Sequence, residues 1–152
     1  MADVQRTIEL LQSIVTPLSQ QATGHAIQAR VFNAQGLTKL AEKYAEHADE
    51  ERGYVQKCVD RILDLGGEVK NESKQETKIF KDPIEFLKAD LQISKDGLAW
   101  LKNIVDESKD DFTTYDMLKD YYKDEETDMY WMEQQLELID RIGLQNWFAT
   151  QI

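Results

Sequence analysis

Apolar side chains recur at alternating steps of three and four residues along four long segments of the chain, a spacing typical of amphipathic helices. The pattern predicts four long helices and a short C-terminal one, at about residues 4–35, 37–65, 83–108, 114–141 and 144–151. Glycine follows three of the long segments, at residues 36, 66 and 143, and glycine commonly ends a helix. The chain is therefore predicted to be all-α.

Residues suited to begin a helix support three of these limits. Asp3 can cap the first helix and Thr113 the fourth, because their side-chain oxygens accept hydrogen bonds from free backbone N–H groups. Residues 82–85, Asp-Pro-Ile-Glu, match a capping box with proline at the first helical position. Pro17 falls inside the first segment and predicts a local kink, because it lacks an N–H group.

The connections between the segments indicate the topology. A single glycine joins the first two helices, which makes them an antiparallel hairpin. Residues 67–81 are polar, show no helical period and are long enough to travel the length of a bundle. Four helices of similar length with one long middle crossover are typical of a ferritin-like four-helix bundle. We expect a single domain over residues 1–152.

Composition narrows the classes of function. The net charge of −11 argues against nucleic-acid binding, because phosphate binding needs clustered lysine and arginine. No apolar run approaches the ~20 residues that cross a membrane. Cys58 is the only cysteine, so it cannot form an internal disulfide, and residues 1–4 lack the features of a signal peptide. We therefore expect a cytoplasmic protein.

Polar residues interrupt the apolar faces near the middle of three helices, at Glu51, Ser94, Glu125 and Asp128. A buried, unpaired carboxylate costs several kcal/mol, so these side chains are expected to meet a cation, shared protons or basic partners. Tyr54 lies three residues after Glu51, as Asp128 does after Glu125, so each pair shares one helix face. The alternative is a polar layer that hydrogen-bonds to Tyr54, Ser94 and buried water.

Both histidines also fall on inward faces. His47 lies four residues before Glu51, and the two side chains could share a cation. His25 lies about two turns from the centre of its helix and is expected to be at most a supporting residue. For each of them the alternative is a hydrogen-bonded core histidine.

A second acidic face, away from the apolar one, carries Glu42, Glu46, Asp49 and Glu50. In a hollow assembly this face could point inward, where Glu46 and Glu50 would gather cations weakly and help to start a mineral. The alternative is an ordinary solvated helix surface.

Three stretches of the sequence resemble bacterioferritin, and the similarity extends over nearly the whole chain. They are QARVF at 28–32 followed by GL at 36–37, DRILDLGG at 60–67 and LIDRIGLQN at 138–146. The resemblance implies an octahedral cage of 24 subunits that stores ferric mineral. It also implies a di-iron centre inside each bundle, which oxidises ferrous iron, and haem bound between paired subunits.

The resemblance also assigns the six positions of the family's iron ligands. The bridging glutamates fall on Glu51 and Glu125, the terminal glutamates on Leu18 and Ser94, and the terminal histidines on Tyr54 and Asp128. Leucine cannot ligate, and the hydroxyl groups of serine and tyrosine are poor ligands for ferrous iron. We therefore expect a degenerate di-iron centre with weak or absent ferroxidase activity.

The family's haem-ligating methionine falls on Arg52. A guanidinium group has no lone pair to donate to iron, so haem binding of the family kind is not expected.

Together these patterns predict a bacterioferritin-like subunit for intracellular iron storage or homeostasis, with iron as its metal and without haem. It is expected to form dimers and a cage, alone or with a catalytically complete sister subunit. Two alternatives stay open. One is residual ferroxidase activity at Glu51, Glu125 and Asp128, and the other is a metal-free structural subunit that assembles with a catalytic partner.

Overall fold

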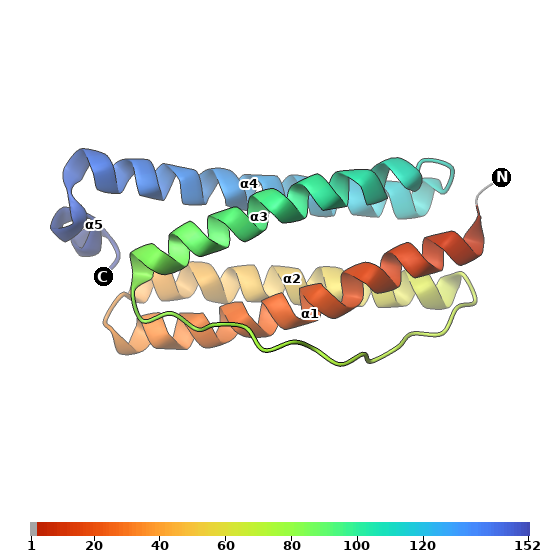
Figure 1. The fold of residues 1–152 in the computed structure, drawn as a ribbon, viewed down its shortest axis with the longest axis horizontal. Coiled ribbons are helices and arrows are strands. Elements are labelled where there is room, and N and C mark those ends of the chain that lie inside the picture. Colours follow the sequence, from red (N-terminus) through yellow and green to blue (C-terminus); the bar gives the residue numbers. More distant parts are fainter. Residues whose placement is uncertain (1–2) are drawn as a thin grey trace.

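The computed structural model of the protein describes residues 3–152, which form five helices and no strand (Figure 1). The helices are α1 (Val4–Ala34), α2 (Thr38–Asp64), α3 (Pro83–Glu107), α4 (Phe112–Ile142) and α5 (Leu144–Thr150). α1 and α2 form one antiparallel pair and α3 and α4 another, while α5 lies at the end of the bundle where α4 stops (Figure 1). The prediction of an all-α four-helix bundle with a short fifth helix is confirmed.

α1 begins where the sequence indicated. The carboxylate of Asp3 accepts a hydrogen bond from the backbone N–H of Arg6 at 3.1 Å, and this bond satisfies one of the free donors of the first turn. The helix then continues as one element of 31 residues through Pro17. Gly36 follows it with φ +81°, a backbone conformation that glycine adopts without strain.

α4 starts two residues earlier than a cap at Thr113 would allow. Asp111 is the capping residue, and its carboxylate accepts a hydrogen bond from the Thr114 backbone N–H at 3.1 Å. Arg61 on α2 holds the same carboxylate, with its Nη2 atom 2.9 Å from Oδ1. The prediction of Thr113 as the cap is therefore wrong, because a long-range ion pair fixes Asp111 in the capping position.

The long crossover runs along the α1 and α2 pair before it reaches α3 (Figure 1). Glutamine side chains of α1 bind its backbone. Gln28, fully buried, donates to the Phe80 carbonyl at 2.7 Å and accepts from the Phe80 N–H at 3.0 Å. Gln12 makes the same pair of bonds with Lys70, at 3.0 and 2.9 Å. These amides replace the partners that a helix or sheet would supply to the crossover backbone.

Two apolar clusters, one toward each end of the bundle, hold the four long helices together. The first includes Leu11, Ile14, Ile62 and Leu118, and the second includes Phe32, Leu40, Tyr44, Leu87 and Trp147. Burial of each such side chain stabilises the fold by about 1.5–3 kcal/mol. The middle of the bundle, between the clusters, is left to polar side chains.

Across residues 3–152, none of the helices combines the length and the apolar character that a membrane crossing requires.

Candidate functional site

Polar and charged side chains from all four long helices form a layer in the middle of the bundle. Its members are His25 from α1, His47, Glu50 and Glu51 from α2, Asp90 and Ser94 from α3, and Glu125 and Asp128 from α4. His25, Glu51 and Asp90 are each at most 6% exposed, so their charges are effectively removed from water. The layer divides into two parts that differ in how these charges are balanced.

In the first part, His25 lies between two carboxylates. Its Nδ1 atom contacts the carboxylate of Glu51 on α2, and its Nε2 atom lies 2.8 Å from Oδ1 of Asp90 on α3. Both ring nitrogens face carboxylate oxygens, and the imidazolium form of histidine, which donates from both nitrogens, satisfies both contacts. Burial lowers the pKa of His25, but the Asp90 and Glu51 carboxylates outweigh burial and raise it well above its ordinary value.

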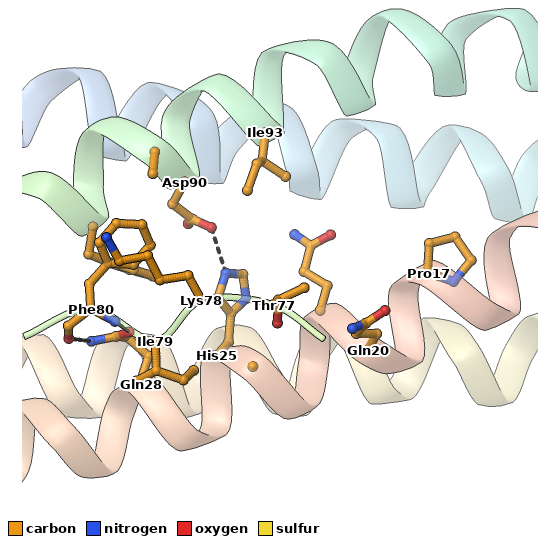
Figure 2. A pocket seen from close by; sticks show the side chains of 14 residues that line it. Pro17, Gln20, His25, Gln28, Thr77, Lys78, Ile79, Phe80, Asp90 and Ile93 are labelled. Carbon is orange, nitrogen blue, oxygen red and sulfur yellow. Dashed lines mark hydrogen bonds and ion pairs between the residues drawn. The ribbon is translucent and has the colours of Figure 1, made fainter. Parts of the chain in front are cut away.

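This arrangement agrees with the alternative interpretation of His25 as a hydrogen-bonded core histidine. The side chain crosses from α1 toward α3 beside a cavity of about 260 Å³ between these helices and the crossover (Figure 2). His25 is therefore a central group of the layer, because within residues 3–152 no other member of the layer links three helices through ion pairs.

Asp90 is the residue that the sequence analysis missed. It pairs with His25 and also accepts a hydrogen bond from the Tyr44 hydroxyl at 3.3 Å. A signal for it was available, since Asp90 lies three residues after Leu87 and four before Ser94, on the inward face of the same helix.

In the second part, two buried atoms lack hydrogen-bond partners. His47 is 3% exposed, and its Nε2 atom lies 3.3 Å from Oδ1 of Asp128 without forming a hydrogen bond. Oε2 of Glu51, the oxygen that faces away from His25, is likewise buried without a hydrogen-bond partner. Burial raises the pKa of the Glu51 carboxyl, although His25 opposes the shift.

Glu125 and Ser94 line a cavity of about 200 Å³ with Leu18 and Tyr121. Three positions where the resemblance places glutamate ligands therefore line one cavity. Glu125 is still a glutamate, whereas the other two are Leu18 and Ser94. Burial, followed by the charges of Glu51 and Asp128, raises the pKa of Glu125 well above its ordinary value. This carboxyl is therefore held toward its neutral form.

The polar-layer interpretation expected Tyr54 to hydrogen-bond within the layer. In the structure it binds a different carboxylate. Its hydroxyl donates to the carboxylate of Asp124, and its ring packs on Tyr121 with the centroids 4.9 Å apart. Burial, followed by the Asp124 contact, raises the pKa of Tyr54, so the phenol stays protonated.

The second acidic face is mostly solvated. Glu42, Glu46 and Asp49 are exposed, but Glu50 is half-buried beside the layer. Burial, together with the charges of Asp128 and Asp124, raises the pKa of Glu50 to about 7. Arg52, at the position of the haem methionine, is also exposed, and its Nη1 atom lies 3.7 Å from Asp49 Oδ1.

The layer does not fit a resident di-iron centre. Among residues 3–152, no three histidine, cysteine, aspartate or glutamate side chains converge as a ligand set for a metal ion. Leu18 offers no donor atom, and one oxygen of Glu51 is already bound to His25. The resemblance to bacterioferritin implies iron ligands at both of these positions.

Comparison with known proteins identifies the family. Residues 8–142 match the ferritin-like domain. The chain belongs to the ferritin family. Its relatives include a bacterial ferritin of Neisseria meningitidis serogroup B, 31% identical over 151 residues, or 97% of each chain. A bacterial ferritin of Pseudomonas aeruginosa is 32% identical over 148 residues, covering 95% of this chain and 96% of the relative.

A bacterioferritin of Rhodobacter capsulatus is 30% identical over 137 residues, which are 89% of this chain and 83% of the relative. The resemblance inferred from three stretches of sequence is thereby confirmed, and the bundle is a ferritin-like one. The polar layer contains the residues at which the sequence predicted a degenerate metal centre.

Proposed function

We propose that this chain is a subunit of a ferritin-type cage for intracellular iron storage, and that its bundle centre does not work as a di-iron ferroxidase. Family membership over residues 8–142 and relatives named bacterial ferritin support the storage role. The proposal that the bundle centre is no ferroxidase rests on the ion pair of His25 with Glu51. It engages an oxygen that a bridging ligand would have to offer to iron.

The exposed acidic face of α2 supports a role in collecting iron as cargo. Carboxylates concentrate cations when they are ionised, and Glu46 is exposed and free of cross-helix ion pairs in the described part of the chain. The partly protonated Glu50, whose pKa is about 7, is the weaker collector at neutral pH. We propose that Glu46 and Glu50 face the interior of the cage and help to start the mineral.

We also propose that the subunit binds no haem, because Arg52 occupies the methionine position. The cage consists either of this chain alone or of this chain with a sister subunit that supplies iron oxidation. Co-assembly would explain how a subunit without a complete centre still serves a mineralising cage.

The first test is the size of the particle in solution and its metal content after growth with iron. Light scattering on the purified protein is expected to show a large closed assembly that contains iron. A metal-free monomer or dimer would exclude the storage function.

The second test is oxidation of ferrous iron. The protein is loaded with ferrous ions without oxygen, air is admitted, and ferric absorption is followed with time. The matched control is the double variant Glu51→Ala with Glu125→Ala. We expect wild type and control to oxidise iron at the same rate, and faster oxidation by the wild type would show that the centre is catalytic.

Residual ferroxidase activity is the rival function, and one observation favours it. Nε2 of His47 and Oε2 of Glu51 are buried without hydrogen-bond partners, and Asp128 lies 3.3 Å from the former. An imidazole nitrogen next to a carboxylate oxygen is a pair of donors of the kind that a metal ion uses. The same oxidation experiment decides between the two functions.

A further inference from the structure

We propose that the cavity between α1, α3 and the crossover binds a small, neutral organic molecule built on one or two aromatic rings. The cavity has a volume of about 260 Å³, and Figure 2 shows side chains of all three segments around it. It shares His25 and Asp90 with the polar layer, but these two side chains already bind each other. The inference goes beyond iron storage, because the ligand is organic.

The walls of the cavity are mainly apolar. They are formed by Pro17 of α1, Ile79 and Phe80 of the crossover, and Phe86, Ala89 and Ile93 of α3. Pockets for small molecules in proteins are typically concave and lined by apolar and aromatic side chains, with a few polar groups that fix orientation. The cavity has this composition.

The crossover is a fixed wall of the cavity, because glutamines of α1 hold it on both sides of residues 77–79. Gln20 Oε1 accepts a hydrogen bond from the Gln75 N–H at 3.0 Å. Gln28 binds both backbone groups of Phe80, at 2.7 and 3.0 Å. The segment between these anchors covers the cavity, so a bound molecule would lie between the crossover and the helices.

A glycine on α1 leaves space in the cavity. Gly24 lies inside the helix and is not one of the glycines with positive φ, and glycine at such a position stabilises a helix less than alanine does. A Cβ atom added to Gly24 would have Thr77 Oγ1 as its nearest neighbour, at 3.8 Å, which is an ordinary contact. Crowding does not require glycine here, and its effect is to keep the cavity open.

The size and the rings of the cavity indicate the class of ligand. An apolar protein cavity of roughly 150 Å³ holds one benzene molecule, so about 260 Å³ is enough for two fused rings. Phe80 and Phe86 pack edge-to-face with their centroids 5.9 Å apart. A ligand ring would extend this cluster through the same kind of contact.

The charges around the cavity favour a neutral ligand. An anion is repelled by the net charge of −11 and meets the Asp90 carboxylate in the lining. The ammonium group of Lys78 lies over the Phe80 ring, 4.7 Å from its centroid. A cation would have to compete for Asp90 with His25 and Tyr44, which bind its two oxygens.

The experiment uses 2-naphthol as the probe, because it has two fused rings and one hydroxyl group. Its binding to the full chain is measured by isothermal titration calorimetry, with 2-naphthoate as the charged match. We expect one 2-naphthol per subunit and a Tm that rises with its concentration. The dissociation constant of 2-naphthoate should be at least about tenfold higher, because the carboxylate must leave water.

A substitution that fills the cavity locates the site. Ala89→Leu should raise the dissociation constant of 2-naphthol about tenfold or more, because the larger side chain occupies the cavity. Ala99→Leu is the matched control, since Ala99 is an exposed residue of the same helix outside the lining, and its affinity should equal that of the wild type. If Ala89→Leu does not fold, Gly24→Leu fills the cavity from α1, and the same comparison applies.

Cleavage of the crossover by trypsin gives a second readout. Lys74 and Lys78 are exposed in this segment, and a molecule bound beneath it should restrain the backbone. Saturating 2-naphthol is expected to slow cleavage of the wild type several-fold. In the Ala89→Leu variant the same concentration should leave the rate unchanged, which also controls for an effect of 2-naphthol on trypsin.

Three results would overturn the proposal. The first is no binding of 2-naphthol to the wild type. The second is equal affinity of the wild type and the cavity-filling variant, which would place the probe elsewhere. The third is tighter binding of 2-naphthoate, which would make the site one for anions. None of these measurements uses iron, so failure here is distinguishable from failure of the storage function.

Discussion

The two parts of the polar layer solve the same electrostatic problem in different ways. On the side of α1 and α3, the carboxylates of Glu51 and Asp90 each meet a ring nitrogen of His25, whose pKa they raise. On the side of α4, Glu125 has no such partner, and burial beside other carboxylates shifts its pKa upward. A buried carboxylate is stable either as an ion with a cation or as a neutral acid, and this bundle contains both solutions.

The largest effect is expected from Asp90→Ala, which leaves the buried His25 imidazolium with one carboxylate. Breaking a buried ion pair costs about 3–5 kcal/mol, so the variant should lose roughly 4 kcal/mol of stability. Denaturant unfolding at a fixed subunit concentration measures this loss. Asp96→Ala is the control on the same helix, since Asp96 is exposed and accepts a hydrogen bond from Gln92 at its surface. Equal losses in the two variants would contradict the assigned role of His25.

A second comparison uses one substitution in both parts of the layer. Glu51→Gln removes a charge that His25 needs and should cost about 2 kcal/mol. Glu125→Gln replaces a carboxyl already held toward its neutral form and should change stability by less than about 1 kcal/mol. Both are measured by unfolding at pH 7. A greater loss of stability from Glu125→Gln than from Glu51→Gln would contradict this difference between the two parts of the layer.

The pH dependence of stability should be reduced in a Glu50→Gln variant. The pKa of Glu50 is raised to about 7 in the folded protein, so between its ordinary value and 7 the unfolded chain binds fewer protons. The free energy of unfolding of the wild type must therefore fall as pH rises through this range. In the variant this fall should be smaller by about 1 kcal/mol, allowing for solvent screening. Unfolding at pH 5 and pH 8 measures the difference. Identical pH profiles would show that Glu50 is solvated.

The smallest effect is expected from Tyr54→Phe. The hydroxyl makes one hydrogen bond, to Asp124 near the bundle surface, and its loss should cost about 0.5–1 kcal/mol. The ring keeps its packing on Tyr121 in the variant. Thermal unfolding at pH 7 measures the change. A loss as large as that of Asp90→Ala would place Tyr54 among the residues that balance the buried charges.

The helices could be predicted from the sequence because the apolar period and the capping residues depend only on neighbouring positions in the chain. The apolar period predicted the bundle, and Asp3 caps α1 as expected. The candidate site was only partly accessible. Glu51 and Glu125 stood out as acids on apolar faces, whereas Asp90 was overlooked although it lies on the same period as Ser94. Its importance depends on a partner 65 residues away, which no local pattern shows.

What the sequence determined by itself is the all-α bundle and the lack of a donor atom at Leu18, because helix period and side-chain chemistry are properties of single residues and short segments. Leu18 cannot ligate iron in any fold. What only the tertiary structure decided is which charges meet. The register of α1 against α2 and α3 places His25 between Glu51 and Asp90, and Arg61 selects Asp111 as the cap of α4. Pairings of this kind depend on helix packing, since the partners are distant along the chain and adjacent only in the folded bundle.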